Sequence, residues 1–118
     1  MITLKTLPQA TAQEVFDTVK NHLFKQGAKS AKRIDFFGDT CAYRGRDGLK
    51  CAAGCLIGDD EYVASMEKNT WRDLADKGIV PNYHLGLIHK LQKIHDNEDP
   101  VDWAISLESL AKEFGLKY

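Results

Sequence analysis

The sequence predicts an α+β fold that is mostly helical, with about five helices packed around one short antiparallel β-hairpin. Three observations lead to this prediction. Apolar residues recur at helical spacing on both sides of the centre of the chain, and capping signals precede several of these stretches. The segment between them carries an Asp-Gly turn. The length of 118 residues corresponds to a single globular domain over 1–118.

The first helix is predicted by a capping box and by one apolar stripe. Thr11 can accept a hydrogen bond from the amide of Glu14, whose side chain can reach back to Thr11. Gly27 is placed to end the helix in the left-handed conformation. The following residues are less regular, and 34–37 could form a short strand or a loop anchored by its aromatic residues.

The central segment, residues 41–57, contains all three cysteines. Residues 41–44 and 49–53 are predicted to form two short strands, with 45–48 as the four-residue turn between them. A hairpin of this length is not stable alone, so one of its faces should lie on the helices.

Two shorter helices are predicted after the central segment. Asp59 or Asp60 can cap the first of them, which would continue through Met66. Thr70 and Asp73 form a second capping box, which predicts a helix from residue 71.

Two longer helices complete the prediction. Asn82 can cap a helix through about Asp96, and Gly86 inside it indicates a close contact, because glycine weakens a helix by about 1 kcal/mol relative to alanine. Asp99 can cap the last helix, and Gly115 can end it. Trp71 and Trp103 fall on apolar stripes and are expected in the core, whereas Tyr83 and Tyr118 are expected at the surface.

Formal charge divides the chain into two halves. Residues 1–58 carry nine Lys and Arg against five Asp and Glu, a balance of +4, and residues 59–118 carry seven against twelve, a balance of −5. Such asymmetry can mark an anion-binding face or an acidic face, but it also fits two solvated surfaces that complement each other. An acidic C-terminal half could engage a basic surface of another protein.

The sequence gives an expectation for the cellular location. There is no apolar run near 18 residues, so no membrane span and no membrane partner are expected. The N-terminal residues lack the basic and then apolar pattern of a secretion signal. An odd number of cysteines fits reduced thiols better than a disulfide framework. We therefore expect a cytoplasmic protein.

The string CAYRGRDGLKCAAGCLIGDDEY at residues 41–62 resembles a group of small proteins encoded by tailed phages and prophages. The shared core comprises CAYRG, DGLKC and GCLI, followed by an acidic helix start, and the resemblance covers most of the chain. Arg46 and Gly58 stand where the group is expected to have proline. The resemblance implies a phage accessory protein in the host cytoplasm with a shared structural core, and it implies no reaction and no catalytic residues.

The cysteines suggest two possible sites, a metal site and a catalytic thiol, and neither is favoured. Cys41, Cys51 and Cys55 are weak metal candidates, because zinc sites usually show close cysteine pairs at both ends and the spacing here is C-x9-C-x3-C. Buried, inert thiols are the preferred interpretation, and no cofactor is expected. A thiol-dependent enzyme is also less favoured, since no acid, base and oxyanion donor can be identified together.

The favoured function is therefore binding, at the predicted hairpin. Its candidate contact residues are Tyr43, Arg44, Arg46, Asp47 and Lys50. Together with the resemblance, they suggest a phage protein that binds a host protein, as an inhibitor or modulator of the host-takeover or anti-defence type. The alternative is a small anionic, nucleotide-like ligand at residues 43–50, held by turn amides and cations. A nucleic-acid partner is not expected, because the net charge is −1.

Overall fold

The computed structural model describes the backbone of residues 1–34 and 38–118, and the side chains of 1–31 and 42–118. Its helices and strands, in chain order, are α1 (Ala12–Gln26), β1 (Ala31–Ile34), β2 (Gly38–Cys41), α2 (Trp71–Asp76), α3 (Leu85–Asn97) and α4 (Trp103–Glu113). Short 3-10 turns fill much of the chain between β2 and α2.

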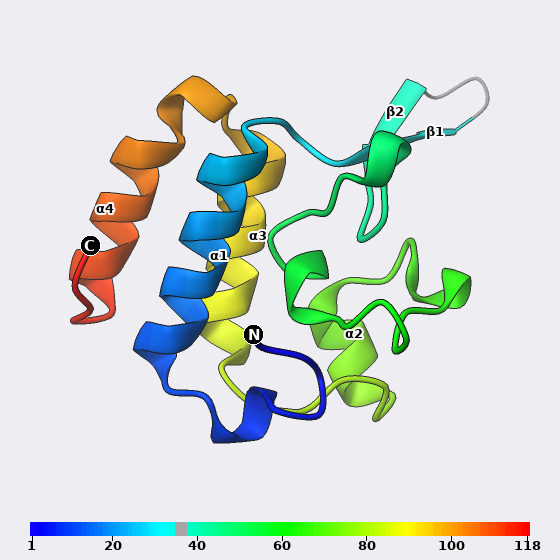
Figure 1. Ribbon diagram of the computed structural model, residues 1–118, viewed down its shortest axis with the longest axis horizontal. Helices are drawn as coiled ribbons and strands as arrows, with labels where there is room; N and C mark the ends of the chain where they lie inside the picture. The colour runs from blue at the N-terminus through cyan, green and yellow to red at the C-terminus, as the bar shows by residue number, and fades with distance from the viewer. Residues whose placement is uncertain (35–37) are drawn as a thin grey trace.

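Helix α3 is the element on which the others pack, since it contacts α1, α2 and α4. Figure 1 shows α4 at one edge of the molecule, α1 beside α3, and α2 on the far side of α3 from α4. Leu87, Ile88 and Leu91 on α3 are buried, and they share the core with Phe16 of α1 and Trp103 of α4. Burying each such side chain stabilises the fold by about 1.5–3 kcal/mol.

The predicted ends of α1 are confirmed. The amide of Glu14 donates to Thr11 Oγ1 at 3.1 Å, and the amide of Thr11 donates to Glu14 Oε1 at 2.9 Å. Gly27 ends the helix with φ of 65°. The capping box of α2 is also present, between Thr70 and Asp73.

The helix expected from Asp59 or Asp60 to Met66 is wrong, because only a 3-10 turn, Ala64–Met66, forms there. The carboxylate of Glu61 instead accepts hydrogen bonds from the amides of Gly58, Leu4 and Lys5 at 2.7, 2.8 and 3.1 Å. Burial alone would raise the pKa of Glu61, but these three hydrogen bonds outweigh it and lower the pKa. This carboxylate therefore ties the N-terminal segment to the turn.

Helix α3 begins two residues later than predicted. Its N-cap is His84, with φ of 56°, and not Asn82. The imidazole Nε2 of His84 bonds the carbonyl of Ala10 at 2.8 Å, which fixes the start of α3 against the N-terminal segment. The close contact expected at Gly86 is absent, since a Cβ there would meet no described atom within 4 Å beyond its chain neighbours and the backbone of its own helix.

The last helix starts as a 3-10 turn, Pro100–Asp102, that leads into α4. The side chain of Asp99 makes no capping hydrogen bond there. Gly115, with φ of 66°, follows the end of α4 as predicted. Trp103 and Trp71 are buried, and Tyr83 and Tyr118 are about half exposed, as the sequence indicated.

The predicted α+β fold built around a hairpin at 41–53 is wrong. The fold is mainly helical, and residues 42–58, here called the central loop, contain no strand. Side chains from α1, from α3 and from the segment before β1 bond backbone groups of the central loop. Gln26 bonds the amide and the carbonyl of Lys50, and Gln92 accepts from the amide of Ala53. Ser30 Oγ donates to the carbonyls of Ala42 and Leu49 at 2.7 and 3.1 Å.

The two strands that the structure does describe lie before the central loop. They pair antiparallel with Ala31 opposite Cys41, and they pack mainly against each other. Figure 1 shows this short ribbon projecting from the helices and not forming the centre of the molecule. The strand or loop expected at 34–37 thus includes the end of β1, and 35–37 lie outside the described residues.

Candidate functional site

Arg44 is the centre of the hydrogen-bonding network inside the central loop. Its Nη1 donates to the carbonyl oxygens of Gly54 and Tyr43 at 2.8 and 3.2 Å. Its Nη2 donates to the carbonyl of Ile57 at 2.7 Å and to Asp59 Oδ1 at 3.1 Å. The side chain is only 17% exposed. The guanidinium is therefore used to hold the loop together, and it does not face outward.

Two of the three predicted cations converge on one carboxylate. Asp59 Oδ1 lies 3.2 Å from Lys50 Nζ and 3.1 Å from Arg44 Nη2. The hydrogen bond from Lys50 and then that from Arg44 lower the pKa of Asp59. An anionic ligand at residues 43–50 would have to compete with this exposed aspartate for both cations.

Tyr43 belongs to the core, with 7% of its surface exposed. Its amide and that of Arg44 donate to the carboxylate of Glu67 at 3.0 and 3.1 Å, and its hydroxyl donates to the carbonyl of Asn69 at 2.6 Å. Tyr62 donates to the same carboxylate at 2.6 Å. Burial raises the pKa of Tyr43 far above its usual value.

The exposed part of the predicted contact surface is the turn that carries Arg46 and Asp47. The amide of Gly45 closes this turn by donating to the carbonyl of Leu49 at 2.9 Å. Asp47 has φ of 56°, a conformation that aspartate tolerates better than most residues. The five residues chosen from the sequence are therefore neighbours in the loop, but they do not form one open surface.

The two thiols that the structure describes lie inside the molecule. Cys51 is 1% exposed and Cys55 is partly buried. Burial raises the pKa of the Cys55 thiol to about 12 and raises that of Cys51 further. Both are therefore protonated at neutral pH, which does not favour a thiolate nucleophile or a thiolate ligand. The Cys41 thiol lies outside the described side chains.

We expect native Cys51 and Cys55 to resist iodoacetamide at pH 7.5, because alkylation requires the thiolate. Residue-resolved mass spectrometry should show labelling at least a hundredfold slower than in urea-unfolded protein. Since the readout is taken peptide by peptide, reaction at Cys41 does not confuse it. Labelling of Cys55 at the rate of a free thiol would contradict the assignment of the thiols as packed core groups.

The described part of the chain contains no cluster of candidate metal ligands. No group of three His, Cys, Asp or Glu side chains is placed there to hold a metal ion. The predicted trio also included Cys41, whose side chain is not described.

A serine, a histidine and an aspartate meet in the interior, but not as a hydrolase triad. The amide of Ser30, and not its hydroxyl, donates to His95 Nε2 at 3.0 Å. His95 Nδ1 donates to Asp96 Oδ1 at 2.8 Å, in the tautomer that these two bonds require. A triad needs the hydroxyl on the imidazole, whereas the Ser30 hydroxyl donates to backbone carbonyls. These groups therefore join the β1 end of the chain to α3.

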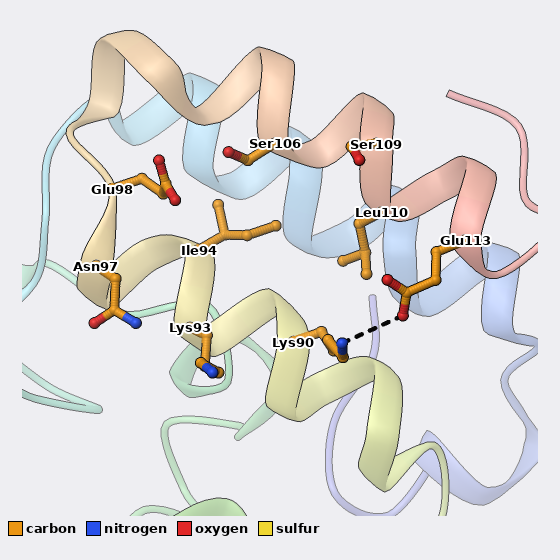
Figure 2. Close-up of a pocket in the computed structure, with 9 residues that line it drawn as sticks. All are labelled: Lys90, Lys93, Ile94, Asn97, Glu98, Ser106, Ser109, Leu110 and Glu113. Carbon is orange, nitrogen blue, oxygen red and sulfur yellow. Dashed lines mark ion pairs between the residues drawn. The ribbon is translucent and has the colours of Figure 1, made fainter.

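A groove of about 380 Å³ runs between α3 and α4. Figure 2 shows Ile94 and Leu110 between the two helices, with the ion pair of Lys90 and Glu113 at one end. Glu98 lies near the opposite end, so charges of both signs line the groove.

A smaller cavity, of about 240 Å³, lies where the central loop, the segment 67–71 and α3 meet. Of its lining residues, the candidate sites predicted from the sequence included Tyr43 and Cys51, and Trp71 was predicted as a core residue. It missed the contribution of α3, from His89, Gln92, Lys93 and Asp96. Their spacing of three and four residues does mark one helix face, but a polar helix face is usually solvated, so it did not point to a site.

The chain matches no protein-family model, no curated protein and no solved structure. Within the described residues, no helix has both the length and the apolar character needed to cross a membrane.

Proposed function

We propose that this chain is a phage or prophage accessory protein that acts in the host cytoplasm by binding a host protein, as an inhibitor or modulator. The observation that carries the proposal is the outer surface of α4 and of the 3-10 turn that leads into it. Val101 in that turn and Ile105 on α4 are 83% and 73% exposed. The resemblance of residues 41–62 to small phage proteins supports the phage origin and the host setting.

The surroundings of these two residues indicate the chemistry of the partner. Asp102, the last residue of the same 3-10 turn, and Glu108 of α4 lie three residues before and after Ile105 in the chain. All four side chains are exposed, and we call them the α4 face. Apolar side chains ringed by carboxylates suit a partner that offers an apolar pocket with a basic rim.

The location of α4 makes this surface accessible within the described fold. Figure 1 shows α4 as the outermost helix, with α1 and α3 on its inner side. Ser109, one turn after Ile105, lines the groove between α3 and α4, so the α4 face borders that groove. A bound segment could therefore contact both surfaces.

A binding role also fits the chemistry of the interior. The described thiols are protonated, and the Ser30, His95 and Asp96 groups are occupied by internal hydrogen bonds. The alternative, a small anionic ligand at residues 43–50, is weaker on this geometry, because Arg44 and Lys50 are already engaged by Asp59.

The test is affinity capture of host proteins with the wild-type chain and with the double variant Val101→Ser/Ile105→Ser. The matched control is Val63→Ser/Ile79→Ser, which removes the same two side-chain types from exposed positions elsewhere. A captured protein is identified, purified and titrated by calorimetry. We expect the α4 variant to weaken binding at least tenfold and the control to change it less than twofold.

Salt provides a second readout of the same interface. If the carboxylates of the α4 face meet a basic rim, the affinity should fall as ionic strength rises, because exposed charges are screened. Capture that is equally strong with the Val101→Ser/Ile105→Ser variant would overturn the proposed surface.

A further inference from the structure

The cavity of about 240 Å³ beside the central loop has the form of a small-ligand site. It is below the roughly 300–1,000 Å³ typical of pockets for drug-sized ligands, so it suits a single-ring molecule. Its walls come from three separate parts of the chain that the fold brings together: the central loop, the segment 67–71 and helix α3. Buried Tyr43 and Trp71 line it from the first two parts, and the partly buried Gln92 lines it from α3, so the cavity is formed by the fold itself.

Two aromatic rings form the apolar part of the lining. Tyr43 and Trp71 meet edge to face, with ring centroids 6.4 Å apart and planes at 60°. Both belong to the core, at 7% and 4% exposed, and the hydrogen bond from the Tyr43 hydroxyl to Asn69 fixes its ring. Fixed aromatic walls favour a flat, partly apolar ligand, which can pack on them with little loss of side-chain freedom.

The two carboxylates of the lining are already occupied. Glu67 accepts from the amides of Tyr43 and Arg44 and from the hydroxyl of Tyr62. Asp96 Oδ1 accepts from His95 Nδ1 and from Gln92 Nε2, at 2.8 and 2.6 Å. Both carboxylates are therefore held by internal donors, Asp96 through Oδ1 alone.

The two lysines that line the cavity differ from its carboxylates in their hydrogen bonding. Lys68 and Lys93 are exposed and line the cavity. In the part of the chain that the structure describes, no hydrogen bond or ion pair engages either ammonium group. Lys68 also has φ of 66°, which is uncommon outside glycine and is found preferentially at functional positions.

We propose that this cavity binds a small planar organic anion, with its ring against Tyr43 and Trp71 and its carboxylate or phosphate at the mouth between Lys68 and Lys93. The site is distinct from the α4 face and does not depend on the proposed host partner. It also differs from an anion site at the 45–48 turn, because Arg44 and Lys50 take no part in it.

The experiment uses benzoate and phenyl phosphate as probes, with benzamide as a neutral molecule of the same shape. Amide chemical shifts of the full chain are followed by NMR during titration to 20 mM. We expect saturable shifts for the anions at Tyr43, Cys51, Trp71 and Gln92, which are contributed by all three walls. Benzamide should bind at least tenfold more weakly, because it lacks the charge.

A charge-removal variant tests the role of the two lysines. Lys68→Asn/Lys93→Gln deletes both ammonium groups, and asparagine tolerates the left-handed backbone at residue 68. The matched control is Lys90→Gln, one turn earlier on α3, which lines the α3–α4 groove and not this cavity. We expect the double variant to weaken anion binding at least tenfold and the control to change it less than twofold.

Three outcomes would overturn the proposal. They are the absence of saturable shifts at the cavity with either anion, equal binding of benzamide, and an equal loss of affinity in the Lys90→Gln control. None of these results depends on capture of a host protein, so failure here is distinguishable from failure of the proposed function.

Discussion

Replacing Gly54 with alanine is expected to lower the free energy of unfolding by about 3 kcal/mol, at the upper end of what overpacking costs. A Cβ at this position would lie 2.4 Å from the carbonyl oxygen and 3.1 Å from the carbonyl carbon of Tyr43. Because these are backbone atoms, no side-chain rotation can relieve the clash. The backbone at Gly54 would have to move away from the backbone at Tyr43.

That opening would also disturb the arginine network. The carbonyl oxygens of Gly54 and Tyr43 both accept from Arg44 Nη1, so moving either residue weakens its hydrogen bond to the guanidinium. Urea unfolding followed by tryptophan fluorescence measures the effect, because both Trp71 and Trp103 are buried.

Gly86→Ala is the matched control, because the same substitution falls where there is room. A Cβ at Gly86 would meet no described atom within 4 Å beyond its chain neighbours and the backbone of its own helix, and the residue lies in the first turn of α3. We expect stability to stay equal or to rise by up to about 1 kcal/mol, from the better helix propensity of alanine. An equal loss of stability in both variants would contradict the argument from the Tyr43 contact.

Replacing Arg44 with alanine is expected to cost about 2–4 kcal/mol of unfolding free energy. The carbonyl oxygens of Gly54 and Ile57 would lose their charged donor, and hydrogen bonds to charged groups contribute about 1.5–3 kcal/mol each. The guanidinium also lies 5.1 Å from the ring centroid of Tyr62, so a cation–π contact is lost. Urea unfolding again provides the measurement.

Arg44→Lys should recover little of this loss. A lysine ammonium is one point donor, and it cannot reproduce the planar fork that reaches Gly54 and Ile57 together. Arg46→Ala is the matched control in the same loop, and because Arg46 is exposed we expect a cost below about 1 kcal/mol. Full recovery by lysine would show that charge alone, and not the fork, holds the loop.

The contrast between these two arginines changes how the predicted contact surface should be tested. A variant that lacks Arg44 would lose binding simply because the loop is damaged. Arg46→Ala and Asp47→Asn keep Arg44 and its hydrogen bonds, and asparagine tolerates the left-handed backbone at residue 47, so these variants can report on a partner at the turn.

The sequence was a good guide where a capping box or a glycine marked a helix end, whereas the single caps predicted at Asp59 or Asp60 and at Asn82 did not start a helix. The capping boxes at Thr11 and Thr70 predicted the starts of α1 and α2, because each bonds residues only three apart. Gly27 and Gly115 marked helix ends for a similar reason, since a positive φ is a property of the residue itself. The burial of Trp103 followed from the spacing of one apolar stripe.

The candidate sites could not be predicted from local sequence signals. The cavity lining combines Tyr43, Trp71 and Lys93, which only the packing of the central loop and segment 67–71 on α3 brings together. The α4 face could not be separated from the ordinary solvated side of a helix until the positions of α1 and α3 showed which side of α4 is uncovered.

By itself, the sequence determined most of the helical framework, the burial of the two tryptophans and the turn signal inside the segment 41–57. Only the tertiary structure decided what that segment becomes. A turn signal such as Asp47-Gly48 predicts a hairpin if the flanking backbone groups have no better partner. Here Gln26, Ser30 and Gln92 supply those partners from distant parts of the chain, so the segment folds as a loop held from within by Arg44.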